Sequence, residues 1–541
     1  MFTGFWPLIK LIFRRDRVKL PVWIICFTVF LLWMIPLLKE MYSDADTLAT
    51  LYQTFALNPA GIFLTGMMDG PTFGALITIE TVLWWGLAIA FMNILLIVRH
   101  TRQNEEMGAQ ELIQSCRVGR WASLLAVLKV AFLTNMIITV ALGFGMTLLT
   151  DQWSASQSWL YALSMGLFGM TWAAITAVVA QFFESTRSVI GTMSILVGAA
   201  FIIRGVGDFM GAAASHGGLI QPMWISYLSP FGWMQATRAL TYPEWWPLVI
   251  PALFIVVAII WAFFLQGVRD VGAGLLPARK GRDRAKPFLR TLPGLTWYLQ
   301  KNIFLGWFIG TLSFIMIIGW LVPEMADVFD SSEFTQQLIQ AIGGMGAIIP
   351  AFLSTFLMLT AIAVIGYVMQ GLSKMRSEEA KGYLENLLAT RVSRFKWMAF
   401  HVGMVIDCST LILVSSGVVL AVSTNLLTDV SVSVWDFTLA AFSYVPVVLA
   451  FIGVYVLLFG LIPRAAGAIV WSYYGFIAFA TWVGPMIGLP EWLMNLNIMK
   501  HVAAAPANEI MIVPLLIITG VAVVAYVVGN IVWRNRDLAT S

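Results

Sequence analysis

Long apolar runs, separated by short polar stretches, recur along the whole chain. Each is close to the ~20 residues that an α-helix needs to cross the hydrocarbon core of a bilayer. The fifth and eleventh runs are rich in glycine and polar residues. The pattern predicts an all-α polytopic membrane protein with twelve transmembrane helices, at 20–38, 73–98, 121–149, 159–183, 189–210, 246–268, 303–322, 348–370, 397–422, 437–461, 467–489 and 510–533.

Composition supports a membrane protein rather than a set of soluble domains. Of the 541 residues, 60% are hydrophobic and only 11% are charged, whereas soluble domains carry about a quarter charged residues. The first apolar run is as long as a full span and no small-residue cleavage site follows it, so we expect a retained helix rather than a signal peptide. The three cysteines lack paired spacing, which argues against a disulfide framework or a metal site.

The basic residues predict the orientation. With both termini inside, the inner segments hold 27 of the 32 Lys and Arg residues, as the positive-inside rule requires. The loop between the seventh and eighth runs is acidic instead and is expected outside. A basic stretch over 269–290 then divides the chain into two six-helix halves, 1–286 and 287–541. Residues 5–19 and 294–303 precede the first helix of each half and are expected to be interfacial elbow helices.

A charged segment is repeated after the second and eighth runs. Residues 102–120 match residues 376–394 at a shift of 274, with seven of 19 positions identical, where background residue usage gives about one. A second echo, Arg269-Asp270 and Arg536-Asp537, closes each half at a shift of 267. Duplicated halves are a common plan in transporters, so the repeat favours two pseudo-symmetric halves.

The repeated segment has two interpretations. A single copy is best explained as a solvated, charge-rich loop, but a generic loop needs no register, and two matching copies favour a docking element for a soluble partner. Steps of three residues rotate backwards by about 60° on a helix, so the segment is expected to display charge around its girth. Gly108 and Gly382 either permit close approach of another backbone or mark a bend.

These residues resemble a known family. The pattern Arg-x-x-Glu-x-x-Gly-x-x-Glu-x-x-Leu after the second helix resembles the coupling helix of ABC-2-type exporter permeases. Leu387 and Leu388 keep its apolar tail, whereas Gln114 departs from it beside Ile113. The segments 204–208, 228–233 and 272–277 are more narrowly similar to the tetronasin-resistance or polyketide-antibiotic exporter permeases, in which one chain contains both halves.

The resemblance implies coupling helices at about 102–117 and 376–391 that bind two copies of a cytoplasmic ABC ATPase. It assigns ATPase coupling to Arg102, Glu105, Gly108, Glu111, Arg117, Arg376, Glu379, Gly382, Glu385 and Arg391. ATP and Mg²⁺ would then reside on the partner, and this chain would bind no cofactor. The resemblance and the apolar composition together indicate a small amphiphilic cargo, such as a polyketide antibiotic or a lipid.

Five ionisable residues lie inside predicted spans, namely Glu80, Lys129, Arg204, Asp208 and Asp407. A charge at a helix centre costs about 2.5–3.5 kcal/mol, so each needs a reason. Arg204 and Asp208 stand at i and i+4 and are expected to neutralise each other. For the other three, hydrogen bonding between helices is weighed slightly above a place on the substrate path.

The chain shows no chemistry of its own. It contains no Gly-Lys dipeptide, so a phosphate-binding Gly-x-x-x-x-Gly-Lys-Ser/Thr loop is excluded, and it contains no Gly-x-Ser-x-Gly elbow. Its four histidines lack metal-ligand spacing. Taken with the family resemblance, this leads us to expect a non-enzymatic permease subunit of an ATP-driven exporter in the bacterial cell membrane, with lipid around it and no nucleic-acid partner. An ion-coupled secondary transporter and a membrane enzyme are the alternatives.

Overall fold

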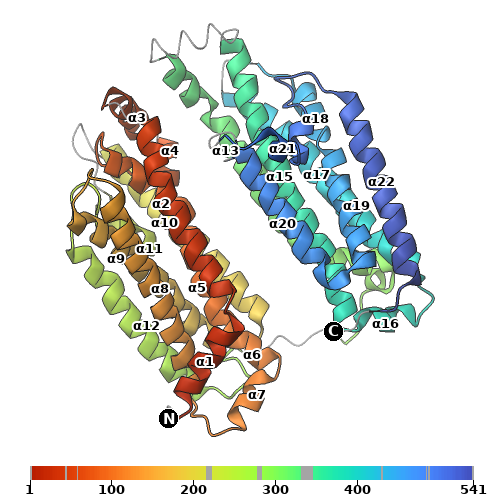
Figure 1. Ribbon diagram of the computed structural model, residues 1–541, viewed down its shortest axis with the longest axis horizontal. Coiled ribbons are helices and arrows are strands. Elements are labelled where there is room, and N and C mark those ends of the chain that lie inside the picture. The colour runs from red at the N-terminus through yellow and green to blue at the C-terminus, as the bar shows by residue number, and fades with distance from the viewer. Residues whose placement is uncertain are drawn as a thin grey trace. The chain divides into compact units, whose positions relative to one another are not determined.

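The computed structural model describes residues 3–42, 45–57, 59–214, 222–276, 283–330, 345–427, 431–482, 484 and 488–538. Across these residues the regular secondary structure is helical, without a strand. The chain divides into two compact units, Met1–Gly281 and Arg282–Ser541. Within the described residues, eleven helices are long and apolar enough to cross a membrane, six in the first unit and five in the second (Figure 1).

The first unit begins with a short helix, followed by its span-length helices and their connecting segments. In chain order its elements are α1 (Phe5–Arg15), α2 (Lys19–Met41), α3 (Ala45–Leu57), α4 (Pro59–Thr65), α5 (Phe73–His100), α6 (Arg102–Glu106), α7 (Ala109–Gln114), α8 (Ala122–Leu149), α9 (Ala155–Phe182), α10 (Thr186–Ala214), η1 (Trp224–Leu228), α11 (Pro230–Gln235), η2 (Trp246–Leu248) and α12 (Val249–Val268).

Helix α9 lies at the centre of the first unit and packs against α5, α8 and α12. Glycine permits the close approach to α8, because a Cβ on Gly169 would lie 2.1 Å from Asn135 Oδ1. Asn135 Nδ2 donates to Asn93 Oδ1 at 2.7 Å and Asn93 Nδ2 donates back at 3.2 Å. This reciprocal pair satisfies two buried amides and joins α5 to α8 beside α9, as polar side chains between membrane helices commonly do.

The second unit has a similar order of long helices. Its elements are η3 (Pro287–Arg290), α13 (Leu292–Asp330), α15 (Met345–Ala380), α16 (Tyr383–Leu388), α17 (Arg394–Leu427), α18 (Val434–Phe442), α19 (Val445–Leu461), α20 (Pro463–Trp482), α21 (Glu491–Met494), η4 (Ile498–His501) and α22 (Ile512–Asn535). Helices α19 and α22 pack along each other, and the fully buried Trp397 of α17 stacks on Trp533 of α22 at 5.3 Å.

The structure departs from the predicted spans in two places. The tenth run remains one candidate span, Val434–Leu461, but it is interrupted between α18 and α19, because Pro446 has no N–H to donate to the carbonyl four residues earlier. The eleventh run forms α20, a helix of 20 residues that is not among the eleven span-length apolar helices of the described chain. The twelve-helix count therefore stays a prediction.

Of the two segments predicted to be elbow helices, only the one in the first unit forms a separate helix. Helix α1 ends at Arg15, and a turn at Asp16 separates it from α2. Residues 294–303, expected to form an equivalent segment, are instead the early turns of the continuous helix α13. No glycine or proline lies between Leu295 and Ile303, so the helical hydrogen bonds continue unbroken.

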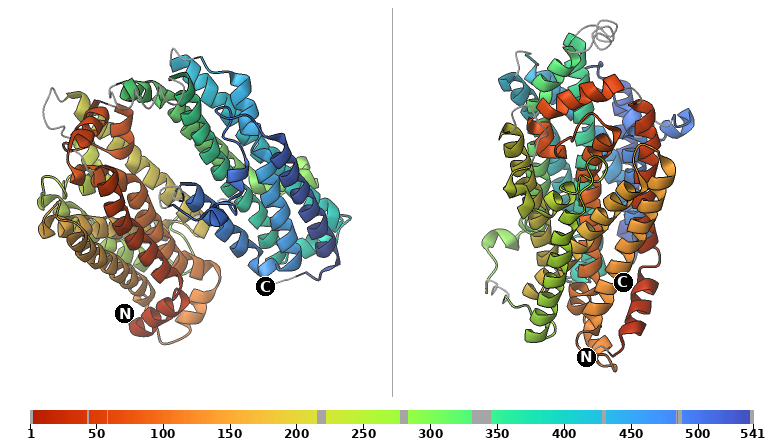
Figure 2. Two further views of the ribbon diagram at one scale, coloured as in Figure 1. Left: turned by 45° about the horizontal axis from the view of Figure 1, so that its top comes forward. Right: turned by 90° about the vertical axis from the view of Figure 1, so that its left-hand side faces the viewer.

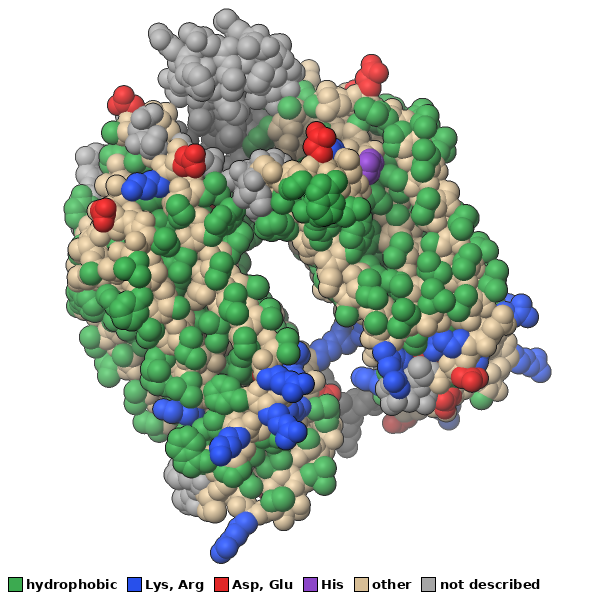
Figure 3. Space-filling model, in the orientation of Figure 1, with side chains coloured by type: hydrophobic (Ala, Val, Ile, Leu, Met, Phe, Trp, Pro, Cys, Tyr) green, Lys and Arg blue, Asp and Glu red, His purple; other side chains and the backbone are tan. Residues whose placement is uncertain are grey.

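Charged and apolar side chains are unevenly distributed over each unit. Lys and Arg side chains gather toward one end of each unit, and the surface between the ends is largely hydrophobic (Figure 3). In the first unit that basic end carries the N-terminus, α1, α6 and α7 (Figure 2). A hydrophobic band bounded by basic residues is what a membrane-spanning bundle requires.

Candidate functional site

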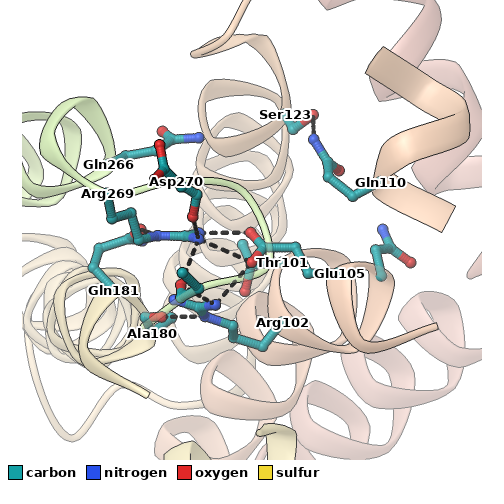
Figure 4. Close-up of polar contacts among 12 residues, drawn as sticks. Thr101, Arg102, Glu105, Gln110, Ser123, Ala180, Gln181, Gln266, Arg269 and Asp270 are labelled. Atoms are coloured by element: carbon teal, nitrogen blue, oxygen red, sulfur yellow. Dashed lines mark hydrogen bonds and ion pairs between the residues drawn. The ribbon is translucent and has the colours of Figure 1, made fainter. Parts of the chain in front are cut away.

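A cluster of charges, two of them on buried arginines, closes the basic end of the first unit. We call Arg102, Glu105, Arg120 and Arg269 the first charge cluster. Glu105 Oε2 accepts from Arg102 Nη1 at 2.8 Å, and Glu105 Oε1 accepts from Arg269 Nη2 at 2.6 Å (Figure 4). The side chains of Arg102 and Arg269 are 0% and 5% exposed. One carboxylate thus neutralises two arginines that water barely reaches.

Further donors of these arginines bind two backbone carbonyls and one side-chain oxygen around the carboxylate. Arg102 Nε donates to Ala180 O at the end of α9, and Arg102 Nη1 also donates to Ala273 O at 3.0 Å. Arg269 Nε donates to Gln181 Oε1 at 2.7 Å (Figure 4). The cluster therefore ties the start of α6 to the ends of α9 and α12, three elements that the chain separates by many residues.

A related cluster closes the basic end of the second unit. We call Arg376, Glu379, Arg394 and Arg536 the second charge cluster. Glu379 Oε1 pairs with Arg536 Nη2 at 2.9 Å, and Glu379 Oε2 lies 3.5 Å from Arg376 Nη1. Here the carboxylate is 0% exposed, whereas Arg376 and Arg536 keep 21% and 15% of their side chains exposed.

The two sequence echoes thus meet in space within each unit. Glu105 and Glu379 belong to the echo at shift 274, whereas Arg269 and Arg536 belong to the echo at shift 267. A further arginine completes the match, because Arg120 Nη2 donates to Arg269 O at 2.7 Å and Arg394 Nη1 donates to Arg536 O at 2.6 Å. Corresponding residues make corresponding contacts, so the repeat extends from sequence to geometry.

The repeated segment bends at its glycine. Gly108 has φ 71° and precedes α7, and Gly382 has φ 72° and precedes α16. A Cβ at either glycine would meet no atom within 4 Å, so the left-handed backbone, not close approach, explains the residue. The bend is therefore the alternative that the structure shows, and each segment is two helices joined at the glycine instead of one. In the first unit α5 also ends before α6, whereas in the second α15 runs unbroken to Ala380.

The prediction that charge surrounds the whole segment is also wrong. Arg102, Glu105 and Glu379 point inward, where their carboxylate–guanidinium pairs form. Their burial is tolerated because each of these charges is surrounded by opposite charges and hydrogen-bonding groups. Contact with a partner would instead be made by the residues after each glycine.

The residues beyond each glycine form the exposed surface. Glu111 and Arg117 are exposed in the first unit, as are their counterparts Glu385 and Arg391 in the second. The buried sides match too, because Gln110 and its counterpart Leu384 are 5% and 1% exposed. Apolar exposure differs, with Leu112 at 73% in the first unit and Tyr383 at 62% in the second. We call the exposed faces of Ala109–Arg117 and Tyr383–Arg391 the first and second docking faces.

The N-terminal helix is anchored beside the first docking face. Asp16 Oδ2 lies 2.5 Å from His100 Nε2, and Asp16 Oδ1 lies 3.1 Å from Arg99 Nη2. Arg15 Nη1 donates to Asn104 Oδ1 at 2.8 Å. These bonds connect the end of α1 to the end of α5 and to α6, so α1 is positioned by the same segment that carries the first charge cluster.

The charges inside the first unit's α10 pair with each other and with nearby groups. Arg204 Nη1 lies 3.4 Å from Asp208 Oδ2, the i, i+4 pair that the sequence predicts. Arg204 Nη2 also donates to Phe63 O and Leu64 O at 3.0 Å, and Asp208 Oδ1 accepts from Ser226 Oγ at 2.6 Å. The pair therefore joins α10 to α4 and η1, and a place for it on a substrate path stays a prediction.

The other three intramembrane charges are not brought together. Glu80 is half-buried on α5, and Lys129 lies 5.0 Å from the centre of the Phe132 ring on its own helix. Asp407 is exposed on α17. None of the three takes part in an ion pair recorded among the described residues. A role for them on a substrate path stays a prediction.

Comparison with known proteins identifies the class of the chain. Residues 289–534 match the family model "Multidrug efflux system permease Rv1217c, C-terminal domain". The chain is 30% identical over 539 residues to the multidrug efflux system permease protein Rv1217c of Mycobacterium tuberculosis, covering 99% of this chain and 96% of that protein. It belongs to this family of multidrug efflux permeases and is a multi-pass membrane protein.

Proposed function

We propose that the chain is the permease subunit of an ATP-driven ABC-2-type exporter for small amphiphilic compounds, as in the export of polyketide antibiotics. A separate cytoplasmic ABC ATPase, present in two copies, hydrolyses ATP. This chain binds no nucleotide and no cofactor. Its basic ends and both termini face the cytoplasm, in keeping with the positive-inside rule.

The observation that carries this proposal is the matched pair of docking faces. Each is a short helix held beyond a left-handed glycine at the basic end of its unit. Each presents an exposed glutamate and an exposed arginine at the same register, together with one large exposed side chain. Two related faces fit two copies of one partner, because each copy then meets similar chemistry.

The charge clusters supply the connection between docking and transport. A push on the first docking face reaches Gly108 and then α6, whose Arg102 and Glu105 are bonded to the ends of α9 and α12. In the second unit the same push reaches α15 directly and α22 through Glu379 and Arg536. Movement of the ATPase would therefore displace spans rather than deform a loop.

Co-purification with the partner tests the docking faces. The chain is co-expressed with a candidate ABC ATPase subunit, and Arg117 and Arg391 are each reversed to glutamate, singly and together. We expect the single variants to weaken binding and the double variant to lose both the ATPase subunit and cargo-stimulated hydrolysis. Each reversal replaces an attractive contact with a like-charge one, which costs several kcal/mol at an interface.

Arg290→Glu is the matched control, because Arg290 is exposed in η3 but lies outside both docking faces. Its complex and its ATPase stimulation should equal those of the wild type. Normal complex formation by the double variant would remove the docking role. Transport by the purified chain alone, driven by a proton gradient, would favour an ion-coupled transporter instead.

A further inference from the structure

A groove on the second unit combines an apolar wall with fixed positive charge. It has a volume of about 620 Å³ and lies between the start of α17 and the last turns of α22. Its lining is Ser393, Arg394, Phe395, Tyr526, Val527, Asn530, Ile531 and Arg534. These described lining residues include two arginines and no carboxylate, so the groove carries positive charge at one end.

The apolar and charged parts are arranged along the helix axis. Val527 and Ile531 are 47% and 57% exposed on one side of α22, one helical turn apart. Arg534 follows on the next turn and is exposed, at the point where the apolar run of α22 ends. The groove therefore runs from hydrocarbon depth to the polar interface, where arginine side chains are found in membrane proteins.

The second cation is held in place by the backbone. Arg394 Nη1 donates to Trp533 O, Arg534 O and Arg536 O at 3.2, 3.1 and 2.6 Å, and its guanidinium lies 5.7 Å from the centre of the Trp533 ring. Carbonyl acceptors and an aromatic face orient this group but leave its unit charge in place. The Arg394 side chain is therefore already ordered, so an anion that binds at the groove costs it little conformational entropy.

The first unit fills the corresponding place. At the shift of 267 that relates Arg536 to Arg269, Asn530 corresponds to Phe263 and Arg534 to Gly267. Phe263 packs on Trp121, the counterpart of Phe395, with ring centres 6.0 Å apart. The duplicated halves have thus diverged at one spot, where Phe263 and Gly267 of the first unit are replaced by the buried amide of Asn530 and the exposed Arg534 in the second.

We infer that this groove is a binding site for one anionic phospholipid of the leaflet on the basic side. The phosphate is held between Arg394 and Arg534, and an acyl chain lies along Val527 and Ile531. Charge complementarity selects an anionic lipid, because a zwitterionic head group would place a third positive charge beside the guanidinium groups of Arg394 and Arg534. This inference does not depend on the ATPase partner or on the cargo.

Native mass spectrometry of the full-length, detergent-purified chain tests the site. The chain is titrated with dioleoyl phosphatidylglycerol or dioleoyl phosphatidylcholine, without ATPase. We expect tighter retention of phosphatidylglycerol, and an increase of about fivefold in its dissociation constant for Arg534→Gln, the loss expected for one basic residue at an anionic surface. Asn530→Phe, which installs the residue of the first unit, should abolish retention by filling the groove.

Arg464→Gln is the charge-matched control, since Arg464 is exposed at the start of α20 and lies outside the groove. It should retain phosphatidylglycerol like the wild type. Equal retention of the two lipids by the wild type would overturn the inference, as would unchanged retention in Arg534→Gln. If Asn530→Phe fails to fold, Arg534→Gln decides, because an exposed substitution leaves the core intact. Displacement of the lipid by inorganic phosphate would show a simple anion site and would also refute the lipid assignment.

Discussion

Glu105 is the position where a single substitution most disturbs the basic end of the first unit. Its carboxylate accepts three charge-assisted hydrogen bonds, from Arg102 Nη1 at 2.8 Å and from Arg269 Nη1 and Nη2 at 3.0 and 2.6 Å. Glu105→Gln keeps the side-chain size but removes the only carboxylate that these two arginines share in the described contacts. Removing one partner of a buried ion pair costs about 3–5 kcal/mol, because a charge is left uncompensated.

The matched substitution in the second unit should cost less. Glu379 is itself buried, but its partners Arg376 and Arg536 are 21% and 15% exposed, so water can solvate them once the carboxylate is gone. We expect about 1.5–3 kcal/mol for Glu379→Gln, the range for a hydrogen bond to a charged group. The two homologous substitutions therefore differ in magnitude for a reason that lies in the burial of the arginines.

Hydrogen–deuterium exchange separates the two effects, because each unit reports on its own segment. At about 1.4 kcal/mol per tenfold change, Glu105→Gln should speed exchange across 102–114 by a hundredfold or more. Glu379→Gln should speed exchange across 376–388 by less than that. Equal acceleration in the two units, or none over 102–114, would refute the account of the first charge cluster.

Two further predictions concern the bend and the pH dependence. Gly108→Ala and Gly382→Ala should each destabilise their segment by about 1 kcal/mol, because the left-handed backbone disfavours a Cβ. Thermal unfolding measures this loss. Gly403→Ala is the control and should not destabilise the protein, because Gly403 lies in a helix with open space around it. Burial raises the pKa of Asp69 to about 6 although Arg238 opposes the shift. Because its folded pKa exceeds the unfolded value, Asp69 contributes stability at low pH that is lost as pH rises through 6. The melting temperature of Asp69→Asn should therefore gain on the wild type between pH 5 and pH 7; a constant difference would show that Asp69 does not titrate there.

Hydropathy alone predicted most of the long helices, because a bilayer demands long apolar segments whatever the tertiary contacts. It did not predict where helices are interrupted or joined, because local backbone chemistry decides this. Pro446 breaks the tenth run into two helices, and the absence of a breaker between Leu295 and Ile303 merges an expected elbow into α13. Such breaks and joins depend on single backbone hydrogen bonds, which hydropathy does not register.

The charge clusters were only half visible in the sequence. The register of the repeat predicted that Glu105 and Glu379 are equivalent, but not that they face inward toward Arg269 and Arg536. The signal was present, since each half ends on a matching Arg-Asp pair. The two echoes have different shifts, and the sequence does not show whether the two echoed segments of one half lie close together in space. Burial of a charge depends on partners that only the fold brings together.

The central claim, that the two docking faces bind the ATPase, is tested most directly by cross-linking. Cys116 is exposed in the first docking face, and Thr390, its counterpart at the shift of 274, is exposed in the second. With Thr390 changed to cysteine, a short thiol-reactive photo-cross-linker should join the ATPase to both positions. Cys26, which is exposed on the span-length helix α2, serves as the control and should give no product. A complex that co-purifies intact yet cross-links at neither position would contradict the account.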